Sequence, residues 1–279
     1  MSPVVATGLM AVVVCAAGGP LFASCYLDTD GLTGRRADGG SDAAVPNGDA
    51  GDAGDAGDAG DAGDAGDAGT FDACAGAVLC DDFERADVTG DWFSAFTNSG
   101  GTVDLDTTTF TSPHRSLRVH VPTSGTARAG LASKDYANVA HVRVAFAMKT
   151  TAASRQMSLF RLSLAPKGTP SAVFDLFMLP DSLGSQEQIF DDAGPGVSHT
   201  FPPLSGFQPD AWQRWTMELD ATVTPAIGVV TLDGIETLRT PMQSPFARGT
   251  LAVTLGAFNA PSGPAQDVFY DDVTITILP

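Results

Sequence analysis

Apolar and polar residues alternate along many short segments between residue 77 and the C-terminus, and this period of two constrains the fold most strongly. Such alternation places apolar side chains on one side of an extended chain, as in β-strands with one buried face. No stretch of twelve or more residues carries an apolar stripe at helical spacing. The region is therefore predicted to be all-β. The predicted strands are Ser116–Val121, Val142–Met148, Ser158–Leu164, Ala172–Met178, Trp212–Leu219, Gly228–Leu232, Leu251–Phe258 and Val268–Leu278.

Turn-forming residues separate these segments. Asp233-Gly234 lies between Val229–Leu232 and Ile235–Leu238, which is a strong signal for a two-residue hairpin. The number of strands is sufficient for two packed sheets. Other turns are predicted at the clusters Thr123-Ser124-Gly125, Gly168-Thr169-Pro170, Ala193-Gly194-Pro195-Gly196 and Pro261-Ser262-Gly263-Pro264.

Several of these segments match the strand pattern of one family of β-sandwiches. The matching segments are Leu79–Glu84 with Trp92, Ser112–Val119, Trp212–Leu219 followed by Val229–Gly234, and Phe269–Ile275. They resemble the first, the paired and the last strands of a concanavalin A-like or laminin-G-like jelly roll. The resemblance implies a two-sheet antiparallel jelly-roll sandwich over residues 71–279, in which the first and last strands are neighbours. A galactose-binding-like jelly roll is the nearest competing architecture.

The N-terminal residues have the composition of an export signal. No charged residue occurs from Met1 to Leu27, and Val4–Ala17 is rich in Val, Ala, Leu and Met. Leu21–Cys25 resembles the bacterial lipobox, which implies a signal peptide over residues 1–25 and lipidation of Cys25. A cleaved secretory signal without lipid and an uncleaved anchor helix are the alternatives. Because Tyr26 replaces the Asp of inner-membrane retention, the resemblance implies an outer-membrane or cell-surface lipoprotein, and otherwise a secreted protein.

Residues 26–70 have the composition of a linker. Gly-Asp-Ala repeats seven times from Gly48 to Ala68, so the segment has too little apolar surface to offset the entropy lost on ordering. We predict a disordered linker that its like charges extend. A collagen-like helix is disfavoured because the triplets lack proline, and a calcium-binding β-roll because they lack large apolar residues.

The chain is acidic, with a formal net charge of −18. Residues 1–70 carry 2 basic and 11 acidic groups and residues 71–279 carry 13 and 22, so each part contributes −9. Without a cluster of Lys and Arg, a nucleic-acid partner is excluded. Cys74 and Cys80 are predicted to form a disulfide, since two nearby cysteines of an exported chain usually pair.

The sequence contains no complete catalytic motif. The β-glucanase branch of the suspected fold has Glu-x-Asp-x-x-Glu on one strand, and here Glu218 and Asp220 lack the third carboxylate. We expect both on the solvent side of a strand whose other side carries Trp215, Met217 and Leu219. Glu187 with Asp191-Asp192 is interpreted as part of a loop. His114, His120, His141 and His199 are expected to be scattered, because they form no metal or nucleophile motif.

Two carboxylates are candidates for a structural calcium site. Asp81 shares the parity of Leu79 and Phe83, and Asp271 shares that of Val273 and Ile275, so both are expected to point inward. A buried carboxylate needs hydrogen bonds or a cation. Neighbouring first and last strands would let Asp81 and Asp271 hold Ca²⁺ together. The alternatives are that each accepts hydrogen bonds separately, or that a bulge breaks the alternation.

The sequence thus favours a cell-envelope lipoprotein with a lectin-like domain that binds carbohydrate or envelope components without catalysis. The alternatives are a glycoside hydrolase-like enzyme and a purely structural envelope protein. Stacking on sugar rings requires exposed aromatic side chains on one sheet. The large aromatics with a polar tip are Trp92, Tyr136, Trp212, Trp215 and Tyr270.

Overall fold

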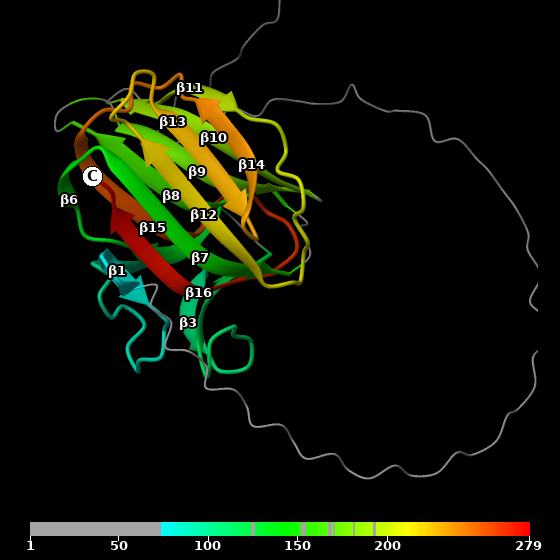
Figure 1. Ribbon diagram of the computed structural model, residues 1–279. Coiled ribbons are helices and arrows are strands. Elements are labelled where there is room, and N and C mark those ends of the chain that lie inside the picture. Colours follow the sequence, from blue (N-terminus) through cyan, green and yellow to red (C-terminus); the bar gives the residue numbers. More distant parts are fainter. Residues whose placement is uncertain are drawn as a thin grey trace, which may run out of the picture. The chain divides into compact units, whose positions relative to one another are not determined.

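Two antiparallel sheets packed face to face build the domain (Figure 1). The computed structural model describes residues 74–123, 126–151, 155–166, 169, 171–180, 182–191 and 194–279, all within the unit Gly66–Pro279. The predicted signal peptide, Cys25 and the predicted linker lie outside the described residues. The part of the chain that is described contains no helix long and apolar enough to cross a membrane.

The first sheet, called sheet A here, has the strand order β14-β13-β12-β7-β16-β4-β3, and β1 also pairs with β16. The first and last strands are therefore neighbours, as the resemblance implied. Leu79 of β1 pairs with Ile275 of β16. The strands of sheet A are β1 (Ala77–Asp81), β3 (Thr102–Asp106), β4 (Ser116–Val121), β7 (His141–Thr150), β12 (Gln213–Asp220), β13 (Ile227–Leu232), β14 (Ile235–Pro241) and β16 (Gln266–Ile277).

The second sheet, sheet B, has the order β11-β10-β9-β8-β15-β5-β2, and β6 also pairs with β15. Figure 1 shows β8, β9 and β10 in the layer behind β7, β12 and β13. The strands of sheet B are β2 (Ser94–Asn98), β5 (Ala127–Ala132), β6 (Tyr136–Val139), β8 (Met157–Ala165), β9 (Ser171–Leu179), β10 (Ser182–Asp191), β11 (Gly194–Thr200) and β15 (Gly249–Ala260).

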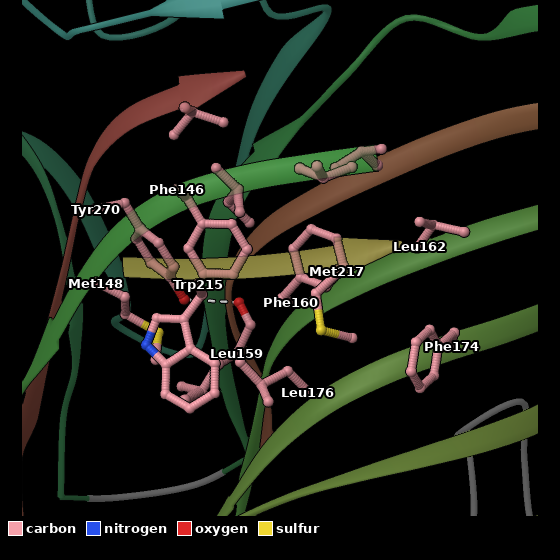
Figure 2. Close-up of a cluster of buried hydrophobic side chains, with 14 of the residues drawn as sticks. Phe146, Met148, Leu159, Phe160, Leu162, Phe174, Leu176, Trp215, Met217 and Tyr270 are labelled. Atoms are coloured by element: carbon pink, nitrogen blue, oxygen red, sulfur yellow. Dashed lines mark hydrogen bonds between the residues drawn. The ribbon is translucent and has the colours of Figure 1, made fainter. Parts of the chain in front are cut away.

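The core lies between the sheets and consists of the inward-facing residues of both (Figure 2). Phe146 of sheet A stacks on Phe160 of sheet B, with their ring centroids 5.2 Å apart. Trp215 and Tyr270 pack beside them and are almost completely buried. The alternation in the sequence therefore specifies one continuous interface between two layers, and the prediction of an all-β two-sheet jelly-roll sandwich is confirmed.

The predicted hairpin is confirmed. Leu232 pairs with Ile235, and both Asp233 and Gly234 have positive φ, 49° and 80°. These angles match a type I′ turn, whose twist fits two paired strands.

Two predictions for the segment after β9 are wrong. Glu187 and Asp191 were expected in a loop, but they belong to β10, which pairs along its length with β9. Gly194–Gly196 were expected in a turn, but they begin β11. The segment has few residues with high strand propensity, and its pairing with β9 overrides that local preference.

Candidate functional site

Asp81 lies at the end of β1, where it organises the loop that follows. Its carboxylate accepts hydrogen bonds from the backbone N–H of Phe83 at 2.9 Å and the indole N–H of Trp92 at 2.7 Å, and it pairs with Arg85. In the pairing of β1 with β16, Asp81 lies opposite Val273. The side chain is buried on the same side of the strand as Leu79.

Asp271 lies on the other side of sheet A, so the expectation that it shares a face with Val273 and Ile275 is wrong. Tyr270 pairs with Met148, and Ile275 pairs with Val144. The register shift between Asp271 and Thr274 adds one residue to β16 and reverses its alternation.

Asp271 fixes the loop between β3 and β4. It accepts hydrogen bonds from the backbone N–H of Thr111 at 2.8 Å, and from the backbone N–H and the hydroxyl of Ser112 at 3.0 and 2.9 Å. Burial raises the pKa of Asp271 to about 6, while the hydrogen bonds from Thr111 and Ser112 oppose that rise.

The carboxylates of Asp81 and Asp271 thus have different hydrogen-bond partners, and no described residue binds both of them. Among the described residues, no group of three or more His, Cys, Asp or Glu side chains could hold a metal ion. The calcium site stays a prediction. Comparing the melting temperature in calcium and in chelator tests it, and equal values would end it.

Glu218 and Asp220 lie on the solvent side of β12, as expected, while Trp215, Met217 and Leu219 face the core. Glu218 accepts from Arg143 at 2.9 Å and lies 2.9 Å from the ring nitrogen Nε2 of His141. Despite its partial burial, these hydrogen bonds lower the pKa of Glu218. The carboxylate is therefore ionised and paired on both oxygens, as expected for a structural group on a strand.

The other sequence candidates are dispersed. His120 lies against Asp267, His199 against Gln243, and His114 is exposed. Glu187 is buried and accepts hydrogen bonds from the backbone N–H groups of Gln243 and Ser244, so it anchors the chain after β14. Cys74 and Cys80 are joined by a disulfide, with their Cα atoms 5.4 Å apart.

Four of the five aromatic residues with polar tips are not available as a sugar platform, and the fifth, Trp212, is half-buried just before β12. Tyr270 and Trp215 are buried in the core, and Trp92 donates to Asp81. Tyr136 is 9% exposed.

A candidate site instead lies on the outer face of sheet B, the face turned away from sheet A. One residue from each of five adjacent strands forms a polar row across it. Successive members of the row are paired in register, which places their side chains on the same side of the sheet. We call this set the polar row: Thr254 on β15, Arg161 on β8, Asp175 on β9, Gln186 on β10 and Thr200 on β11.

Arg161 and Asp175 form the centre of the polar row. The guanidinium donates from Nε to Oδ1 at 2.9 Å and from Nη2 to Oδ2 at 3.0 Å. Asp175 is completely buried, and burial raises its pKa, while Arg161 and Gln186 oppose the rise. The guanidinium carbon lies 5.3 Å from the ring centroid of Phe190 and 5.6 Å from that of Phe258. A fixed cation between two aromatic rings thus lies on this face.

A pocket of about 470 Å³ adjoins the polar row and is called the outer pocket here. Its polar lining consists of Asp135, Ser163, Ser171 and Thr250, and alanine and proline complete it. Ser163 follows Arg161 by two positions on β8, so the two share a face about 7 Å apart along the strand. Pocket volumes of roughly 300–1,000 Å³ are typical of small-molecule sites. The pocket, the ion pair and the rings therefore form one continuous surface.

Sequence reasoning identified the strands of this surface but not the site. The available signal was Asp175, a carboxylate within the apolar run Ala172–Met178. A buried carboxylate requires a partner, and the hairpin register between β8 and β9 supplies Arg161. The pocket could not be inferred, because it depends on how β6 and β8 both pair with β15.

No protein-family model and no curated protein sequence matches the chain. Among solved structures, the chain is similar to the endo-β-1,4-glucuronan lyase from the fungus Trichoderma reesei, with a TM-score of 0.57 and 13% identity. That match covers 72% of this chain and 96% of the lyase. The chain is also similar to the cellulose induced protein Cip1, with a TM-score of 0.54 and 18% identity, over 72% of this chain and 97% of Cip1. At these identities the comparisons establish the fold, a two-sheet jelly-roll sandwich.

Proposed function

We propose that this protein is a non-catalytic carbohydrate-binding module that binds glycan on the outer face of sheet B. The observation that carries the proposal is the outer pocket beside the Arg161–Asp175 pair. The pocket offers hydroxyl and carboxylate groups to sugar hydroxyls, and small side chains let a ring approach the strands. The carboxylate of Asp135 and the hydroxyls of Ser163, Ser171 and Thr250 suit a ligand rich in hydroxyl groups better than an apolar ligand, which could not pair with them.

The similar structures support this class of ligand. One is named a glucuronan lyase and another a cellulose induced protein, so the same sandwich fold occurs in proteins whose names refer to polysaccharides. The side chains on the outer face of sheet B support the proposal more strongly than the similarity of fold does, because a fold alone does not define a function.

Calorimetric titration of the purified protein with cellohexaose tests the proposal. Ala252→Phe fills the outer pocket from a half-buried position on β15 and should abolish binding. Ala145→Phe is the matched control, because Ala145 is half-buried on the outer face of sheet A. Loss of binding in both variants, or in neither, would contradict the assigned face. Release of reducing ends or of unsaturated uronate products from a glycan panel would contradict the non-catalytic part.

The envelope location is part of the same proposal. The lipobox-like Leu21–Cys25 supports a lipid anchor at Cys25, and the acidic linker would hold the domain away from the membrane surface. Metabolic labelling with a radioactive fatty acid should mark the wild-type protein and not Cys25→Ser. Recovery of the label in the outer-membrane fraction would support the outer-membrane address, and its absence from the wild type would exclude the anchor.

A further inference from the structure

The outer pocket has an uncompensated negative charge. Asp135 is exposed and lines the pocket, and within the described part of the chain its carboxylate takes part in no ion pair or hydrogen bond. Its chain neighbour Lys134 forms no ion pair with it, and the ammonium group lies over the ring of Tyr136 instead, 5.5 Å from its centroid. Of the described residues, no Lys or Arg lines the pocket.

The guanidinium of Arg161, on this same face, adds little positive field. Arg161 is held by both oxygens of Asp175, so the pair is close to neutral as seen from the pocket. The region from residue 71 to the C-terminus carries a formal charge of −9. At this surface, a ligand with a carboxylate meets repulsion from Asp135 and from the domain as a whole.

Three hydroxyl groups can complete the recognition of an amine. The hydroxyls of Ser163 and Ser171 lie 2.7 Å apart and bond to each other, which leaves acceptor capacity on both. Thr250 adds a third hydroxyl to the lining. An ammonium group has three donors and no acceptor, so one carboxylate and several hydroxyl oxygens are a suitable set of partners.

From this charge and these acceptors we infer that the outer pocket selects a sugar unit that carries an ammonium group, an amino sugar, over uronic acids. The inference rests on the proposed function. It separates this chain from the similar glucuronan lyase, whose name specifies a polymer of uronic acid.

Four β-1,4-linked oligosaccharides of equal length test the inference by calorimetry at mildly acidic pH, where the amines are protonated. They are chitosan hexamer, its fully N-acetylated form, cellohexaose and oligoglucuronate. The N-acetylated form removes the charge while it retains the sugar backbone. We expect chitosan hexamer to bind roughly three- to fivefold more tightly than cellohexaose, the size expected of one exposed ion pair. High salt should remove the difference.

Asp135→Asn removes the charge at nearly constant size and should reduce the preference for chitosan hexamer to about onefold, measured as the ratio of the affinities for chitosan hexamer and cellohexaose in the same variant. Asp104→Asn, on β3 of sheet A, is the matched control and should retain the preference. Equal affinity for all four oligosaccharides, tightest binding of oligoglucuronate, or a preference unaffected by Asp135→Asn would overturn the inference and leave the proposed function in place. Binding of none would overturn both.

Discussion

Arg161 and Asp175 lie opposite each other on neighbouring strands β8 and β9 and form a bidentate ion pair on the outer face of sheet B. The two partners are unequally buried, since the side chain of Arg161 is 25% exposed and that of Asp175 is fully buried. The carboxylate of Asp175 has no access to water and therefore needs the guanidinium as a partner, whereas the guanidinium of Arg161 can also be solvated.

Arg161→Met should destabilise the domain by about 3 kcal/mol, because it leaves a buried carboxylate without its charged partner. Urea denaturation of both proteins measures the difference in the free energy of unfolding. The double variant Arg161→Met/Asp175→Leu should recover much of the loss, because replacing both partners removes the unpaired charge. A single variant as stable as the wild type would contradict the proposed dependence.

Asp271 should make the domain more stable as the pH falls from 7 to 5. Its folded-state pKa is raised from 3.8 to about 6 by burial, so the folded protein binds this proton more tightly than the unfolded chain does. Its contribution to stability is therefore smallest above about pH 6 and increases as the pH falls toward 4.

The variant Asp271→Asn, which has no proton to gain, isolates this contribution. The free energy of unfolding of the wild type minus that of Asp271→Asn should increase on acidification. If this difference in the free energy of unfolding became smaller as the pH was lowered, the hydrogen bonds from Thr111 and Ser112 would outweigh the effect of burial.

Tyr270 links the two sheets through its hydroxyl, which lies 2.6 Å from the carbonyl oxygen of Leu159 (Figure 2) and 2.9 Å from that of Gly256. Tyr270→Phe should cost about 1–3 kcal/mol, because it leaves buried carbonyl groups without their donor. Tyr136→Phe is the matched control, since the buried hydroxyl of Tyr136 has no hydrogen-bond partner among the residues that the structure describes. Thermal melts should show a clear loss for the first variant and almost none for the second, and equal losses would refute the link.

The disulfide between Cys74 and Cys80 closes a short loop at the start of β1. Loop-closure entropy for so short a loop corresponds to about 2 kcal/mol. Cys74→Ser/Cys80→Ser should therefore lower the melting temperature without changing glycan binding, because the bridge lies in β1 of sheet A. If the folded double variant lost glycan binding, the disulfide and the glycan site on sheet B would not be independent of each other.

The alternation of the sequence identified the central strands well, because their inward faces must be apolar over their whole length. Ser116–Val121, for instance, is β4 to the residue. Asp233-Gly234 was equally clear, since few residues adopt the positive φ that a tight hairpin needs.

One of the missed strands, β5, has residues that serve close packing instead of alternation. β5 is rich in alanine and contains Gly130, where an added Cβ would lie 2.1 Å from the carbonyl oxygen of Leu255. Such a glycine is required by the approach of β15, which local sequence does not reveal. The face of the sheet on which Asp271 lies was also predicted wrongly. One additional residue in β16, between Asp271 and Thr274, places the side chains before it on the opposite face from the one that simple alternation predicts.

An amide-resolved NMR titration of the isotope-labelled protein with cellohexaose tests the glycan site most directly. Chemical shifts should change mainly at Ser163, Ser171 and Thr250–Thr254, while residues on the outer face of sheet A, such as Ala145 and Thr216, stay unchanged. Shifts centred on sheet A, or none at saturating oligosaccharide, would contradict a glycan site on the outer face of sheet B.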